Sequence, residues 1–95
     1  MNNTLQKLEQ VAKLVHAKRD VDDDISMTVG EIGELLTLVG RSMQGRDQLE
    51  DWVDELADVY LQVHILATRL NKQLFIKRLN RKIDFVEDIY TTTRK

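Results

Sequence analysis

Apolar residues recur every three or four positions along almost the whole of this 95-residue chain, and no proline interrupts them. This spacing matches the α-helix, which has about 3.6 residues per turn and therefore places such residues on one face. The sequence also holds only four glycines, so few turns are expected. The pattern predicts an all-α fold in which short connections join the helices.

Four helices are expected from these repeats and from the residues that typically end a helix. Their approximate ranges are 3–18, 25–43, 48–70 and 73–90. Gly45 suits the left-handed conformation that follows the end of a helix, and Asn71 is a plausible stop between the last two helices. The third helix should begin with a capping box formed by Asp47 and Glu50.

The acidic run "RDVDDD" separates the first two helices, and we interpret it as a solvated cap for the second helix rather than a ligand cluster. The candidate capping residues are Asp23, Asp24 and Ser26. The first helix should bury Leu5, Leu8, Ala12 and Val15. The second should present a core stripe of Ile25, Val29, Ile32, Leu36, Val39 and Met43.

The third predicted helix is apolar on more than one face. Its first stripe, which should form core, consists of Leu49, Trp52, Leu56, Val59, Val63, Leu66 and Leu70. An adjacent second stripe consists of Val53, Ala57, Tyr60, His64 and Ala67. So wide an apolar arc exceeds what three partner helices can cover in a small chain. We therefore expect a homodimer or a dimer of dimers, with the third helix near the two-fold axis.

Composition narrows the function. The net charge of −2 makes nucleic acid an improbable partner. The absence of cysteine excludes a thiolate nucleophile, and two histidines supply a metal site poorly, so any metal should be a hard, oxygen-bound ion. Without a signal peptide or an apolar stretch of roughly 18 residues, the chain is expected to be a single cytoplasmic domain, 1–95, that does not enter a membrane.

Two pairs of acids are embedded in apolar sequence, in "VGEIGELL" and "VDELADVY". Glu31 with Glu34, and Glu55 with Asp58, are each spaced by three residues, which places both members on one side of a helix. An antiparallel hairpin of the two helices would bring all four carboxylates together, where they would need cations such as Mg²⁺. Alternatively, acids at this spacing mark a solvated helix face, which is common by chance among 16 acids.

The two motifs, Glu31-x-x-Glu34 and Glu55-x-x-Asp58, lie 20 residues apart in "GEIGEL" and "DELADV" contexts. This pattern resembles the signature of the all-α nucleoside triphosphate pyrophosphohydrolases, the MazG-like superfamily, over residues 28–70. The resemblance implies a four-helix MazG-like bundle completed by homodimerisation. It also implies that the four carboxylates are catalytic and hold Mg²⁺, for which Mn²⁺ can substitute, while water attacks the α-phosphorus of a (deoxy)nucleoside triphosphate.

The implied products are a nucleoside monophosphate and pyrophosphate, as in house-cleaning of the nucleotide pool. Members of the superfamily often contact the nucleotide through basic residues of the last helix, and Lys82 is the closest match here. Gly30 and Gly33 would let another chain segment or the nucleotide approach the acids. A non-catalytic helical association module and a phosphoribosyl-ATP pyrophosphatase remain as alternatives.

Several single residues outside the two motifs also have an expected location. Trp52 is expected to pack in the core, His16 to lie on the surface and His64 to pack in an interface. Arg41 and Arg46, near the end of the second helix, either are solvated, which the sequence favours, or reach phosphates.

Overall fold

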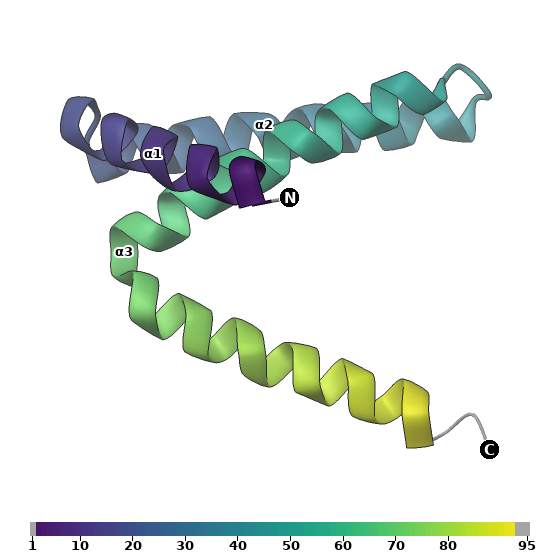
Figure 1. Ribbon diagram of the computed structural model, residues 1–95. Helices are drawn as coiled ribbons and strands as arrows, with labels where there is room; N and C mark the ends of the chain where they lie inside the picture. The colour runs from purple at the N-terminus through teal and green to yellow at the C-terminus, as the bar shows by residue number, and fades with distance from the viewer. Residues whose placement is uncertain (1, 93–95) are drawn as a thin grey trace.

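Three helices make up nearly all of residues 2–92, the part of the chain that this computed structural model describes. They are α1 (Asn2–Lys18), α2 (Val21–Met43) and α3 (Leu49–Thr92). Figure 1 shows that α2 and the first half of α3 run antiparallel as a hairpin and that α1 lies across it. The predicted all-α class is confirmed, and within these residues no helix is both long and apolar enough to span a membrane.

Helix α3 is broken at Asn71, whose backbone leaves the helical conformation (φ −171°, ψ 96°). The Asn71 side chain accepts a hydrogen bond of 3.0 Å from the amide of Leu74, which caps the helix that follows. We call residues 49–70 the proximal arm and residues 72–92 the distal arm. The two arms correspond to the third and fourth predicted helices, and the predicted stop at Asn71 is confirmed.

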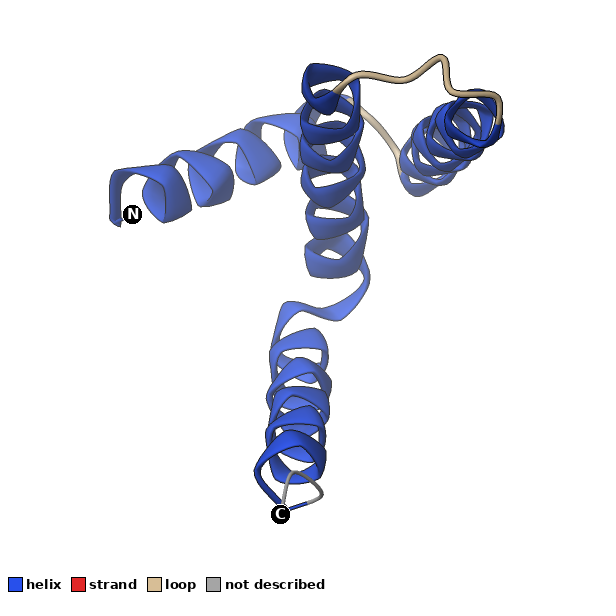
Figure 2. Ribbon diagram, turned by 90° about the vertical axis from the view of Figure 1, so that its right-hand side faces the viewer, coloured by secondary structure: helices blue, strands red, loops and turns tan. Residues whose placement is uncertain are grey.

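The distal arm diverges from the hairpin instead of packing along it (Figures 1 and 2). Apart from the half-buried Phe75, its described side chains are all exposed. These include the residues predicted to face a core, Ile76, Leu79, Ile83, Val86 and Tyr90. A four-helix bundle is therefore not formed within one copy of the chain.

The start of α2 differs from the prediction. Asp20, in an extended conformation, is the N-cap, and its carboxylate accepts a 2.9 Å hydrogen bond from the amide of Asp23. The Asp23 carboxylate accepts one in return from the amide of Asp20, at 3.4 Å, which completes a capping box. The helix therefore begins at Val21, earlier than predicted, because Asp20 satisfies the first free amides. Asp23 is the second member of this box rather than the cap.

The connection between α2 and α3 follows the prediction at one end only. Gly45 has φ 69° and donates its amide hydrogen to Ser42, while Arg46 donates to Arg41, the pattern that ends a helix with a left-handed glycine. The capping box expected for α3 is replaced by another contact. The Asp47 carboxylate accepts a 2.6 Å hydrogen bond from the indole of Trp52.

Little apolar surface is buried within the described residues, where the buried apolar side chains are Ala12, Leu38 and Ile65. The stripe of α2 that was predicted to form core is instead exposed; its members are Ile25, Val29, Ile32, Leu36, Val39 and Met43. In the proximal arm, Leu49, Leu56, Val63 and Leu70 are exposed as well, while Trp52, Val59 and Leu66 are half-buried. In α1, Leu5 is exposed and Leu8 and Val15 are half-buried.

The hairpin closes through faces that mix polar and apolar residues. On α2 the inward side carries Asp24, Thr28 and Glu31 as well as Leu38, and on α3 it carries Glu55, Gln62 and Ile65; each is buried or half-buried. Helical geometry places residues at these spacings on one side and turns the apolar stripes away from it. Within one chain the α2 stripe is left exposed, while part of the first α3 stripe, namely Trp52, Val59 and Leu66, is half-buried.

One acid of the "RDVDDD" run is fully buried rather than solvated. Asp24 has no exposed surface and accepts a hydrogen bond from Nε of Arg69, with Arg19 at 3.6 Å. The Arg69 guanidinium also donates to the backbone carbonyls of Val15 and Arg19 at the end of α1. This ionic cluster fastens the end of α1, the start of α2 and the end of the proximal arm together.

Candidate metal centre

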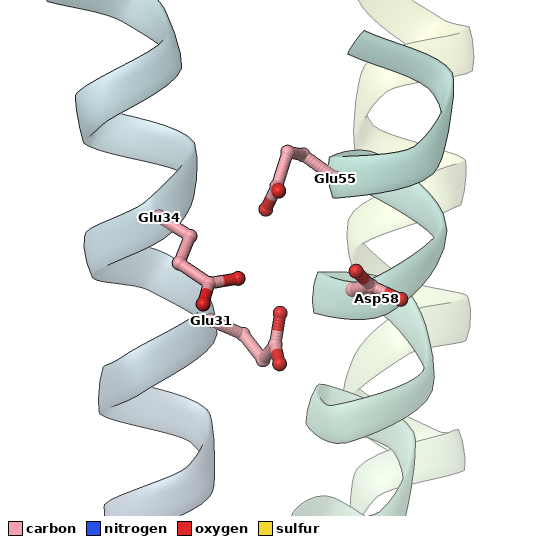
Figure 3. Close-up of side chains that lie close together, drawn as sticks. All are labelled: Glu31, Glu34, Glu55 and Asp58. Atoms are coloured by element: carbon pink, nitrogen blue, oxygen red, sulfur yellow. The ribbon is translucent and has the colours of Figure 1, made fainter. Parts of the chain in front are cut away.

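The four acids singled out in the sequence converge between α2 and the proximal arm. Glu31 and Glu34 extend from α2 toward α3, and Glu55 extends from α3 toward α2, while the shorter Asp58 lies over α3 in the same view (Figure 3). Each offers one carboxylate oxygen, and these four oxygens all lie within 4.8 Å of one another. We call these four residues the acidic cluster.

The hairpin itself produces this convergence. The short connection of residues 44–48, in which Gly45 takes the left-handed conformation, makes α2 and α3 antiparallel, so that residues before the turn face residues after it. Within each helix the three-residue spacing keeps the two acids on neighbouring positions of one side. The predicted convergence of the four carboxylates is therefore confirmed as geometry.

Two carboxyl groups of the acidic cluster have raised pKa values, because burial and neighbouring carboxylates disfavour their charged forms. Desolvation raises the pKa of Glu31, and repulsion from Glu34, Asp58 and Glu55 raises it further. Desolvation likewise raises the pKa of Glu55, with repulsion from Glu34 and Asp58 adding to it. The charge of nearby Arg41 acts in the opposite direction on Glu55. Ionised together, the four groups disfavour the folded chain.

A divalent cation fits this donor set. One carboxylate oxygen each of Glu31 and Glu55 is buried and makes no hydrogen bond. A buried acceptor without a partner is costly, so an atom of this kind points to a ligand. Oxygen-only donors with open sides are what Mg²⁺ prefers, because it keeps several waters or substrate oxygens in its coordination shell.

A pocket adjoins the cluster on the side of the hairpin connection. It is lined by Glu34 and Glu55 of the cluster and by Thr37, Leu38 and Arg41. The sequence favours a solvated Arg41, and in the structure its side chain is 43% exposed while one nitrogen, Nε, is buried and makes no hydrogen bond. The signal that could have located it is its spacing of seven from Glu34, which is two helical turns.

The other candidate residues lie elsewhere. Lys82 is exposed on the distal arm, and that arm diverges from the hairpin that carries the acidic cluster (Figure 1). A methyl group added at Gly30 or Gly33 would meet no atom within 4 Å, so no described segment approaches these glycines closely. The predicted approach of another chain segment is therefore not seen within the described residues, and the approach of a nucleotide stays a prediction.

The two histidines lie together where α1 packs on the proximal arm. His16 was expected at the surface, but it is half-buried and its Nε2 lies 2.8 Å from the carbonyl oxygen of Ile65. His64 is half-buried, and desolvation lowers the pKa of its imidazole. Neither residue belongs to the acidic cluster.

Comparison with known proteins adds no assignment: no family model, curated protein or solved structure matches this chain.

Proposed function

We propose that this chain is a Mg²⁺-dependent nucleotide pyrophosphohydrolase of the MazG-like type. The observation that carries the proposal is the acidic cluster, in which four carboxylates from two motifs of identical spacing meet between two helices, two of them with buried, unpartnered oxygens. The substrate would be a (deoxy)nucleoside triphosphate, cleaved between the α- and β-phosphates to a monophosphate and pyrophosphate. Removal of noncanonical nucleotides from the pool is the corresponding role.

In this proposal Glu31, Glu34, Glu55 and Asp58 hold the metal. Bound Mg²⁺ supplies neutralisation of the negative charge on the phosphate oxygens, which is the main requirement of phosphoryl chemistry. The helices contribute positioning, since the four side chains project from two packed helices and not from loops. Glu31 and Glu55 are half-buried, whereas Glu34 and Asp58 are exposed, and electrostatic interactions are stronger on the less exposed side of the site.

Assembly as a homodimer belongs to the same proposal. The apolar stripes of α2 and of both arms are exposed in one chain, and contiguous apolar surface of this extent is typical of an interface. A second copy would cover these stripes and could bring its distal arm, with Lys82, toward the acidic cluster of the first. The association surface also supports the alternative, a helical association module without catalysis, and metal binding separates the two.

The test combines binding and product analysis. We expect Mg²⁺ or Mn²⁺ to raise the melting temperature, because the ion binds the native cluster selectively. A panel of nucleoside triphosphates with Mg²⁺ should then release pyrophosphate rather than phosphate. Glu34→Gln and Asp58→Asn should abolish both the stabilisation by metal and the release of pyrophosphate, with helicity intact. Glu50 is an exposed acid on α3, the helix of Asp58, and Glu50→Gln should change neither property. A melting temperature indifferent to metal would leave the association module as the better account.

A further inference from the structure

The pocket beside the acidic cluster contains one feature that the metal site does not need. Among the residues that line it, Glu34 and Glu55 are acidic, Thr37 and Leu38 are neutral, and Arg41 is the cation. An anion bound at the cluster through a metal would therefore meet the positive charge of Arg41 on that side of the pocket. The pocket is asymmetric in charge along the direction of α2.

The Arg41 guanidinium is available for such an anion. Its closest charged neighbour is Asp51, at 3.4 Å, which is longer than the roughly 2.8 Å of a strong charged hydrogen bond. Both side chains are 43% exposed, and an ion pair that open is weak. Its Nε is buried and makes no hydrogen bond. The fork of nitrogen donors on a guanidinium matches the oxygens of a phosphate group.

We infer that Arg41 binds the β- and γ-phosphates of the substrate, which become the pyrophosphate product; this inference rests on the proposed function. The triphosphate then lies along α2, with its terminal phosphates toward the hairpin connection and its nucleoside toward the start of α2. The Thr37 hydroxyl lines the same pocket, but its hydrogen is already donated to the carbonyl of Gly33. Arg41 is therefore the lining residue that would donate hydrogen bonds and positive charge to the phosphates.

Isothermal titration calorimetry with inorganic pyrophosphate, at saturating Mg²⁺, tests this directly. We expect the wild type to bind and Arg41→Gln to lose about tenfold or more in affinity, since a charge-assisted bidentate contact is removed. Arg41→Lys should be intermediate, because it keeps the charge and loses the fork. Arg46→Gln removes a charge from the exposed connection, where Arg46 contacts Gln44, and should bind like the wild type.

Mg²⁺ titration of each variant serves as the control for the acidic cluster. It should show that Arg41→Gln binds the metal at least as tightly as the wild type, because a cation beside Glu55 has been removed. In turnover, Arg41→Gln should weaken product inhibition by pyrophosphate but not by the nucleoside monophosphate, an effect that a general loss of fold would not produce.

The outcomes separate the two proposals. Equal pyrophosphate affinity in the wild type and Arg41→Gln, or no pyrophosphate binding by the wild type, overturns the inference about Arg41 even if triphosphates are hydrolysed. Pyrophosphate binding that depends on Arg41 but not on Arg46, without hydrolysis of any triphosphate, supports this subsite and overturns the proposed activity.

Discussion

The carboxyl groups of Glu31 and Glu55 retain protons at higher pH than an ordinary glutamate, because burial and neighbouring carboxylates disfavour their charge. Their pKa is raised in the folded chain above the ordinary value of 4.5. Above about pH 4.5 the folded chain then binds more protons than the unfolded chain, and the free energy of unfolding falls as pH rises through the raised pKa values. Without metal, the cluster destabilises the chain at neutral pH.

We expect Glu55→Gln to raise the melting temperature in EDTA, by an amount that grows as the pH is raised from about 5 to about 7. His64 acts in the opposite direction, since its lowered pKa makes the folded chain more stable as pH rises. Its contribution cancels when wild type and variant are compared at each pH. A difference that is independent of pH would contradict the assigned electrostatics. With Mg²⁺ present the wild type should have the higher melting temperature, because Glu55→Gln lacks one of the proposed metal ligands.

Gly33 offers a second test at the level of the residue. A methyl group there meets no atom within 4 Å, so Gly33→Ala should raise the free energy of unfolding of the chain without ligand by about 0.5 to 1 kcal/mol. If a second chain or the nucleotide approaches this side of α2, the same change should lower hydrolysis. Gly40→Ala, also in open space two turns further along α2, should stabilise equally and leave hydrolysis unchanged. Full activity of Gly33→Ala would show that the glycine has no role in approach.

Among the elements, the junction of α1, α2 and the proximal arm is centred on a buried carboxylate, Asp24. Asp24→Asn should lower the free energy of unfolding by about 3 to 5 kcal/mol, because Arg69 and Arg19 would lose the charge that they pair with inside the fold. Asp22→Asn changes an exposed acid of the same turn and should shift it by less than about 1 kcal/mol. Urea unfolding followed by circular dichroism compares them. Similar values for both would mean that the junction is held by other contacts.

Much of the helical organisation could be predicted from the sequence, because local signals determine it. The left-handed stop at Gly45 and the break at Asn71 depend on the backbone preferences of those residues. The start of α2 was placed too late, since several acids in a row could cap it and only geometry selects Asp20. The burial of Asp24 could not be predicted, because its partner Arg69 is 45 residues away.

At the scale of the molecule, periodicity identified apolar faces but not what covers them. The periodicity assigns the α2 stripe to a core, whereas the hairpin closes through a mixed face that includes Leu38 and leaves that stripe exposed. The acidic cluster was predictable because both motifs lie on helices joined by a short turn. The position of Lys82 was not, since it depends on the direction of the distal arm beyond Asn71.

The exposed stripes lead to a prediction about assembly. Ala57 is exposed on the proximal arm, and Ala57→Glu places a charge on the surface that a second copy should cover. We expect the wild type to sediment as a dimer or larger at micromolar concentration and Ala57→Glu to dissociate and lose much of its helicity. Gln10→Glu adds the same charge at an exposed position of α1 and should stay associated. A folded, active wild-type monomer would overturn the proposed dimer.

Because the break lies at Asn71, a small change in its backbone angles moves the far end of the distal arm by a large distance. The arm extends for about 30 Å at the usual rise per helical residue. Because the pivot is one residue long, a rotation of about 10° there displaces the far end by about 5 Å with both helices still straight. Whatever the end of the arm touches can thus be repositioned by changing two backbone dihedrals. The range of backbone angles open to Asn71 would therefore determine how precisely the distal arm is positioned against a partner.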